Sequence, residues 1–166
     1  MTKVALLGTG LLGSAIGHRL LTVGCSLRVW NRDPARCEPL VSAGAQLLED
    51  PAQAIEGACT VITVLRDGPI TSEVVASLGG LKQCCVMPMG TMGISESVAL
   101  ETQVQDQGGV YLEAPVLGSR PEALAGRLLV MAGGDQAVFD QQCALLKHLA
   151  LEPKRMGAVG TGAASK

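Results

Sequence analysis

Aromatic side chains are almost absent from this 166-residue chain, which contains only Trp30, Tyr111 and Phe139. Hydrophobic residues nevertheless make up 48% of the sequence, so we expect a core built from aliphatic side chains. A basic stripe is also lacking, because the 13 basic and 15 acidic residues are mixed along the chain. Without a basic surface or aromatic platforms for stacking bases, the sequence argues against a nucleic-acid partner.

Long apolar runs and metal-binding cysteine patterns are lacking too. No stretch reaches the roughly 20 apolar residues of a membrane-spanning helix, and the first residues show no signal-peptide pattern. We therefore expect a cytoplasmic protein without membrane contact. The six cysteines match no zinc spacing, so we expect no metal and reduced, structural thiols. Cys84 and Cys85 could form a redox pair, but their apolar surroundings favour two buried strand residues.

What the chain does contain is a regular alternation of short apolar runs and amphipathic stretches. The apolar runs predict strands at residues 3–7, 26–30, 59–65, 84–88, 110–114, 128–132 and 153–156. They are apolar without strict alternation, as in parallel strands that are covered on both faces. The pattern predicts an α/β fold of the Rossmann type, with a doubly wound, mainly parallel sheet and helices on both faces.

Helix signals separate the predicted strands. Leu12, Ile16 and Leu20 mark one face of a first helix, which we expect to end at Gly24. The dipeptides Asp-Pro at residues 33–34 and 50–51 predict two further helix starts, with Asp as the cap and Pro in the first turn. Asp135 is expected to begin another helix.

The most specific local signal is G-x-G-x-x-G, placed between the first strand and the first helix. The spacing suits a dinucleotide, because Gly8 permits a tight turn, Gly10 lets the backbone approach a pyrophosphate and Gly13 lets helix and strand pack closely. Amides at the helix start would face the phosphates. We therefore predict cofactor contacts from Gly8, Thr9, Gly10, Leu11, Leu12 and Gly13.

The end of the second predicted strand bears on the choice of dinucleotide. NAD sites usually place an acidic residue there, whereas this chain has Asn31 and Arg32. A guanidinium can bind a 2′-phosphate through paired hydrogen bonds, so we predict NADP(H) in preference to NAD(H). In the alternative interpretation, Arg32 is a solvated charge and Asp33 binds the ribose. Leu65, at the end of the third predicted strand, and Arg66, directly after it, are further candidates at the cofactor edge, although Arg66 could equally be a surface charge.

Four separated motifs together resemble the amino-terminal domain of β-hydroxyacid dehydrogenases, the relatives of 3-hydroxyisobutyrate dehydrogenase and of glyoxylate/succinic semialdehyde reductases. "GTGLLG" resembles their cofactor loop and "WNRDP" the NADP-preferring second strand. "MGTMGISES" is similar to the stretch near the nicotinamide and places Thr91 there. "EAPVLGS" resembles the substrate motif, usually Asp-Ala-Pro-Val-Ser-Gly-Gly.

The resemblance also gives a meaning to the last residues, "GAVGTGAASK". They are similar to the family's Gly-x-x-Gly-x-Gly-x-x-x-Lys segment, with Lys166 on the catalytic lysine. This implies hydride transfer between the nicotinamide and a small carboxylate-bearing substrate, with Lys166 exchanging a proton with the substrate oxygen. Without the resemblance, a lysine at this position would be read as a solvated charge.

The substrate motif departs from the family pattern. The resemblance implies substrate contacts from Leu117, Gly118 and Ser119, but Leu117 replaces the usual serine and Ser119 the second glycine. Ser119 could offer a hydroxyl to a substrate carboxylate, and Leu117 could narrow the pocket. Glu113 replaces the motif's Asp, and we expect it to cap or pair rather than to take part in the reaction.

The resemblance implies the following organisation. Residues 1–162 would form the dinucleotide-binding domain and 163–166 the start of an interdomain helix, with the family's all-helical carboxyl-terminal domain absent. The isolated domain would be weakly active or inactive, and the full-length enzyme would be a homo-oligomer. Two alternatives remain open at this point: an imine reductase on the same architecture, and a non-catalytic NADP-binding module.

Overall fold

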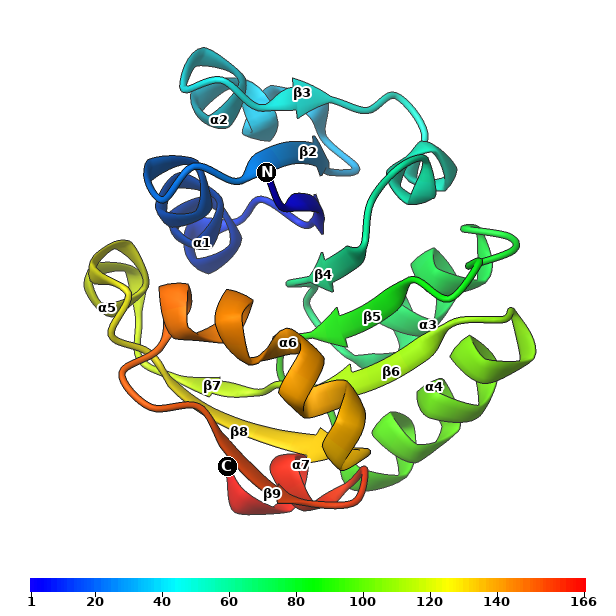
Figure 1. Ribbon diagram of the computed structural model, residues 1–166. Coiled ribbons are helices and arrows are strands. Elements are labelled where there is room, and N and C mark those ends of the chain that lie inside the picture. Colours follow the sequence, from blue (N-terminus) through cyan, green and yellow to red (C-terminus); the bar gives the residue numbers. More distant parts are fainter.

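A single sheet of nine strands organises the chain (Figure 1), of which the computed structural model describes residues 1–166. The strands lie in the order β3-β2-β1-β4-β5-β6-β8-β7, and β9 pairs with β8. Their bounds are β1 Lys3–Leu7, β2 Ser26–Trp30, β3 Gln46–Leu47, β4 Thr60–Thr63, β5 Cys85–Pro88, β6 Val110–Glu113, β7 Val116–Leu117, β8 Leu129–Gly134 and β9 Lys154–Gly157.

The strands from β3 to β6 in this order are all parallel, whereas β8 and β9 run in the opposite direction. Leu6 lies opposite Val29 of β2 and Ile62 of β4, which fixes the central register. β8 runs antiparallel to β6 and β7, whereas β9 is parallel to β8. The predicted α/β fold with a mainly parallel sheet is therefore confirmed.

Helices connect these strands. The α-helices are α1 Leu11–Thr22, α2 Glu38–Ser42, α3 Gly68–Ala76, α4 Ile94–Asp106, α5 Arg120–Ala125, α6 Gln136–Leu149 and α7 Thr161–Ser165, and the short 3₁₀-helices are η1 Pro34–Cys37 and η2 Pro51–Ile55. No helix has the length and apolar character needed to cross a membrane.

Aspartate caps begin four of the helices, and the sequence predicted three of them. Asp33 accepts from the amide of Ala35 at 3.1 Å, Asp50 from that of Ala52 at 2.8 Å and Asp135 from that of Ala137 at 2.8 Å. Both Asp-Pro starts open 3₁₀-helices of only four and five residues rather than long α-helices. Each of these short helices buries a single side chain, so little apolar surface is available to extend it.

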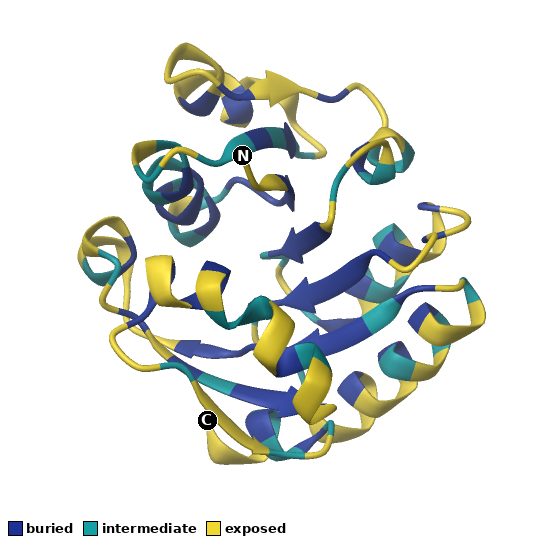
Figure 2. Ribbon diagram, viewed as in Figure 1, coloured by how far each residue is buried: buried dark blue, intermediate teal, exposed yellow.

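The sheet separates two aliphatic cores (Figure 2). The larger core has 26 buried residues, to which α1, α5 and α6 contribute side chains such as Ile16, Ala123 and Leu146. The smaller core has 13, with Val75 from α3 and Leu100 from α4. The six cysteines are free thiols; Cys84 and Cys85 are buried, as expected for residues at the start of an inner strand.

Candidate functional site

The glycine loop between β1 and α1 has the geometry that its spacing predicts. Gly8 has φ +103°, and a Cβ there would overlap the carbonyl oxygen of Val64. A Cβ on Gly13 would overlap the carbonyl oxygen of Gly8, so helix and loop approach closely only because both residues are glycine. By contrast, a Cβ on Gly10 would meet no atom within 4 Å. The backbone at Gly10 therefore faces open space.

The start of α1 offers unpaired amides to that space. Gly10 is the residue before the first turn and supplies no side-chain cap. The amides of Leu11, Leu12 and Gly13 precede the first intrahelical bond, which Ser14 donates to the carbonyl of Gly10 at 2.8 Å. Amides without a protein acceptor at the start of a 12-residue helix suit an anion, so the loop fits the diphosphate of a dinucleotide.

Asn31 connects the glycine loop to the end of β2. Its Oδ1 accepts from the amide of Thr9 at 3.0 Å, and its Nδ2 donates to the carbonyl of Asp33 at 3.0 Å. The Thr9 side chain is buried, 3.5 Å from the sulfur of Cys37. Thr9 and Asn31 thus fix the shape of the loop, and this clamp is a role that the sequence did not indicate.

The charged residues that directly follow β2, Arg32 and Asp33, differ in their partners within the chain. The Arg32 side chain is exposed and makes no hydrogen bond or ion pair within the chain. Asp33, the alternative ribose ligand, uses Oδ1 to cap η1 and places Oδ2 3.9 Å from Nε of Arg36. Arg36 was not predicted from the sequence as a cofactor contact, although its position four residues after Arg32 could have indicated a second guanidinium at this site. The Asp33 carboxylate therefore already has two partners, whereas the Arg32 guanidinium has none.

Leu65 and Arg66 follow β4 at the carboxyl edge of the sheet. A Cβ on Gly8 would contact the side chain of Leu65, and a Cβ on Gly90 would lie 2.8 Å from the carbonyl oxygen of Leu65. It therefore touches both the glycine loop and the loop after β5. Arg66 is exposed and donates from Nε to Oδ2 of Asp67 at 3.1 Å. Asp67 caps α3, and the amide of Ile70 lowers the pKa of its carboxyl.

The structure brings together Thr91 and Lys166, the two residues for which the family resemblance implies a place near the nicotinamide and a role in proton transfer, respectively. Nζ of Lys166 donates to Oγ1 of Thr91 at 2.7 Å, although the residues are 75 positions apart. Thr91 lies in the loop between β5 and α4, and Lys166 follows α7. Both side chains are exposed, and a small cavity beside them is lined by Pro88, Gly90, Met92, Glu113, Pro115 and Ala163.

Beneath this pair lies a buried carboxylate. Glu113, at the end of β6, is 2% exposed and accepts hydrogen bonds from the amides of Gly160 and Gly162 and from the hydroxyl of Ser97. Ser97 also bonds the Tyr111 hydroxyl at 2.9 Å. Burial raises the pKa of Tyr111, and the nearby Glu113 charge adds to that effect. The expectation that Glu113 caps or pairs fits this geometry, but its distant partners could not be read from the sequence.

The three residues of the substrate motif lie at β7 and before α5. Leu117 is 42% exposed and pairs in register with the exposed Leu129 of β8. Gly118 has φ +123°, and Ser119 precedes α5. The hydroxyl and amide of Ser119 both donate to Oε2 of Glu122, at 2.8 and 2.7 Å. A substrate carboxylate could accept a hydrogen bond from the Ser119 hydroxyl only if that hydroxyl gave up its hydrogen bond to Glu122.

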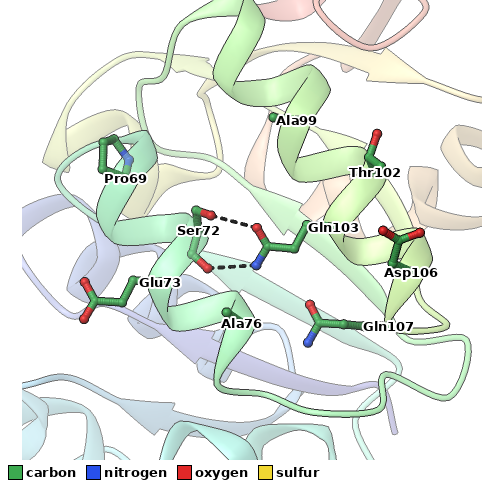
Figure 3. Close-up of a pocket in the computed structure, with 9 residues that line it drawn as sticks. All are labelled: Pro69, Ser72, Glu73, Ala76, Ala99, Thr102, Gln103, Asp106 and Gln107. Carbon is green, nitrogen blue, oxygen red and sulfur yellow. Dashed lines mark hydrogen bonds between the residues drawn. The ribbon is translucent and has the colours of Figure 1, made fainter.

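A broad groove elsewhere on the surface, between α3 and α4, is a poor candidate site (Figure 3). Its lining consists of Pro69, Ser72, Glu73, Ala76, Ala99, Thr102, Gln103, Asp106 and Gln107. Gln103 is already bonded to the hydroxyl and carbonyl of Ser72, at 2.7 and 2.8 Å. None of the lining residues belongs to the glycine loop, to the end of β2 or to α7, so the groove contains none of the residues that the sequence predicts for the site.

Comparison with known proteins agrees with this geometry. Residues 3–160 match the family described as the NAD binding domain of 6-phosphogluconate dehydrogenase. Glyoxylate/succinic semialdehyde reductase 1 of Arabidopsis thaliana is 34% identical over 169 residues, which cover 99% of this chain and 58% of that protein. The chain thus spans little more than half the length of this relative.

Solved structures show the same architecture. 3-Hydroxyisobutyrate dehydrogenase of Mycobacterium tuberculosis with L-serine superposes with a TM-score of 0.92 at 25% identity, over 99% of this chain and 57% of that one. An imine reductase from Pseudomonas sp. also gives a TM-score of 0.92, at 26% identity, over 99% of this chain and 58% of that one.

Proposed function

The chain belongs to the family of the NAD-binding domain of 6-phosphogluconate dehydrogenase, and from this membership we propose that it is the cofactor-binding part of an NADP(H)-dependent oxidoreductase. The proposed reaction interconverts a small hydroxy acid and its semialdehyde or oxo acid. The observation that carries this proposal is the hydrogen bond between Lys166 and Thr91, because it joins the two expected reaction residues at the sheet edge that carries the glycine loop.

Residues of the glycine loop would hold the dinucleotide. The amides of Leu11, Leu12 and Gly13 have no protein acceptor, and Gly10 leaves room above the backbone. When bound, the nicotinamide supplies or accepts the hydride. Asn31 would act indirectly, since it fixes the loop through the Thr9 amide.

Lys166 would exchange a proton with the substrate oxygen in this reaction. Its ammonium uses one N–H for Thr91, which leaves two donors for a substrate oxygen. In the reducing direction, an N–H of Lys166 would stabilise the developing alkoxide and then transfer its proton to it. Since Thr91 accepts from Lys166, its own O–H remains free to donate to the substrate.

The arginines after β2 support a preference for NADP(H). Arg32 is exposed and free of partners, and Arg36 lies close to Asp33. The carboxylate that would bind a ribose 2′-hydroxyl already caps η1, while two guanidinium groups are available for a 2′-phosphate. We propose that Arg32 is the main contact and Arg36 a second one.

Relatives guide the choice of substrate. The name of the Arabidopsis thaliana relative gives glyoxylate and succinic semialdehyde, which both combine a carboxylate with an aldehyde. A substrate of this kind would place its carboxylate near Gly118 and Ser119 and its aldehyde near Lys166. We also propose that residues 1–162 form the dinucleotide-binding domain, that 163–166 begin a connecting helix, and that the isolated chain binds cofactor but turns over substrate weakly.

A second candidate function is imine reduction, which the similar Pseudomonas sp. structure favours. The two candidates differ in the group that accepts the hydride, an aldehyde or an imine. Parallel assays of the complete protein with succinic semialdehyde and with a cyclic imine separate them. We expect turnover of the aldehyde acid, and exclusive turnover of the imine would replace our proposal with the second one.

Titration of the 166-residue chain with NADPH and with NADH tests the cofactor assignment. We expect tighter binding of NADPH, and we expect Arg32→Ala to weaken NADPH binding by about 10- to 100-fold, since a charged hydrogen bond contributes about 1.5–3 kcal/mol. NADH binding should change little. Arg120→Ala, an exposed arginine at the start of α5, is the control. An unchanged NADPH affinity in Arg32→Ala would contradict the role of Arg32.

A further inference from the structure

Glu113 is an unusual residue to find buried, because it is a carboxylate without a cation beside it. Its side chain is 2% exposed, and none of the ion pairs of the chain includes it. Burial of an ionised group is costly unless hydrogen bonds replace its water. The structure provides such bonds, so the position of each donor shows what the carboxylate does.

All donors to Glu113 come from two other segments. Oε1 accepts from the amides of Gly160 and Gly162 at 2.7 Å each, and from that of Ala163 at 3.4 Å. Oε2 accepts from the hydroxyl of Ser97 on α4. Hydrogen bonds from backbone amides to a charged acceptor are stronger than those to a neutral acceptor. The carboxylate therefore joins the start of α7 to α4 across the end of β6.

The glycines around this carboxylate explain the spacing of the last segment. Gly160 has φ +98°, a backbone conformation that favours glycine. A Cβ on Gly162 would overlap the carbonyl oxygen of Met131 and lie 3.0 Å from Oε1 of Glu113, and a Cβ on Gly133 would overlap Oε1 itself. These residues leave the space in which Glu113 reaches the backbone amides.

The same two segments carry the reaction pair. Lys166 follows the anchored turn directly, because its amide donates to the carbonyl of Gly162 at 3.2 Å. Thr91 lies in the loop that enters α4, six residues before Ser97. Glu113 thus fixes both ends of the Lys166–Thr91 hydrogen bond without touching either side chain.

We propose that Glu113 is a positioning residue, which sets the direction of α7 so that the Lys166 ammonium meets Thr91. This inference rests on the proposed role of Lys166. Glu113 acts through the backbone amides of Gly160 and Gly162, and it neither donates nor accepts a proton in the reaction.

The first test needs no cofactor. Amide hydrogen exchange of Gly160 and Gly162, resolved by NMR, is measured in the wild-type chain, in Glu113→Gln and in Glu101→Gln. Glu101 is the control, because it is a half-buried carboxylate on α4 that makes no hydrogen bond to α7. We expect at least tenfold faster exchange at both glycines in Glu113→Gln only. Unchanged exchange in that variant would overturn the anchoring role.

The second test uses the complete protein. We expect Glu113→Gln to lower kcat by about 10²-fold, the size of effect that a displacement of about 1 Å can produce, while KM and the affinity for NADPH stay within threefold. The double variant Glu113→Gln, Lys166→Ala should be no slower than Lys166→Ala alone, because Glu113 acts through the lysine. Multiplicative losses would overturn the inference.

The two tests separate the inference from the proposed function. If the wild-type protein turns over neither an aldehyde acid nor an imine, the proposed function fails, and the exchange experiment still decides whether Glu113 anchors α7. If the wild type is active and Glu113→Gln keeps its kcat, the positioning role fails alone. Glu113→Gln keeps the size of the side chain and one oxygen acceptor, so folding of the variant is expected and is checked by its thermal transition.

Discussion

The role that we propose for Lys166 depends on its contact with a second side chain. At an exposed position a lysine is ordinarily a solvated charge, yet here its ammonium lies 2.7 Å from the Thr91 hydroxyl. This contact uses one of three N–H donors and leaves the other two without a hydrogen-bond partner in the chain. The chemistry that we propose is therefore a property of the pair rather than of the lysine alone.

Replacement of Lys166 by alanine tests this pair at the scale of the residue. In the complete protein we expect kcat to fall by about 10²- to 10⁴-fold, the usual contribution of a positioned proton donor. The affinity for NADPH should not change, because the proposed cofactor contacts lie on other elements. Steady-state kinetics and cofactor titration measure the two quantities. Lys154→Ala, an exposed lysine on β9, serves as the control. A kcat within threefold of the wild type would remove Lys166 from the reaction.

At the scale of the element, the glycine loop permits a prediction with a built-in comparison. Gly13→Ala forces a Cβ against the carbonyl oxygen of Gly8, whereas Gly10→Ala places one in open space. We expect Gly13→Ala to lower the melting temperature, because helix and loop must separate. Gly10→Ala should melt like the wild type but bind the dinucleotide at least tenfold more weakly, because its methyl group occupies the space of the phosphates.

Thermal unfolding and cofactor titration of the two variants are the measurements. Gly79→Ala is not a useful control, because Gly79 has φ +77°. Gly80 is neither crowded nor in a left-handed conformation, so Gly80→Ala controls for the general effect of a glycine substitution. Equal cofactor affinity in Gly10→Ala and the wild type would show that the phosphates lie elsewhere.

Elements also show which parts of the fold and the site could be predicted from the sequence. The glycine loop was readable, because all its requirements fall within six residues. The two-residue strands β3 and β7 were not, since two residues carry no periodicity. The Asp-Pro pairs predicted the caps correctly but not the 3₁₀ form. Glu113 escaped prediction as an anchor, because its partners Gly160 and Gly162 lie 47 and 49 positions away.

At the scale of the whole molecule, Cys84 lies in the smaller core and Cys85 in the larger one, and these buried thiols predict how stability depends on pH. Burial raises the pKa of Cys84 to about 11 and that of Cys85 to about 12, compared with an ordinary value of 9.0. Above pH 9, both thiols lose protons in the unfolded chain but keep them in the folded chain. The stabilisation is therefore complete below about pH 9 and is lost as the pH rises towards the folded values.

We expect the free energy of unfolding to decrease between pH 8 and pH 10, with about 1.4 kcal/mol of the decrease due to Cys85, since one pKa unit corresponds to 1.36 kcal/mol. Urea unfolding at several pH values measures this slope. Cys85→Ala should be less stable at pH 8 but show a flatter pH dependence. Cys143→Ala, a partly buried cysteine on α6, is the control. An equal slope in Cys85→Ala and the wild type would contradict the prediction.

The long sequence separation between Thr91 and Lys166 has a consequence for the order in which the molecule acquires its properties. The glycine loop, β2 and Arg32 all lie within the first 32 residues, whereas the Thr91–Lys166 bond joins residues 75 positions apart. Synthesis begins at the amino end, and contacts distant in sequence form more slowly than local ones. A growing chain therefore contains every residue proposed to read the nucleotide long before residue 166 exists, and it gains the capacity to move a proton only later.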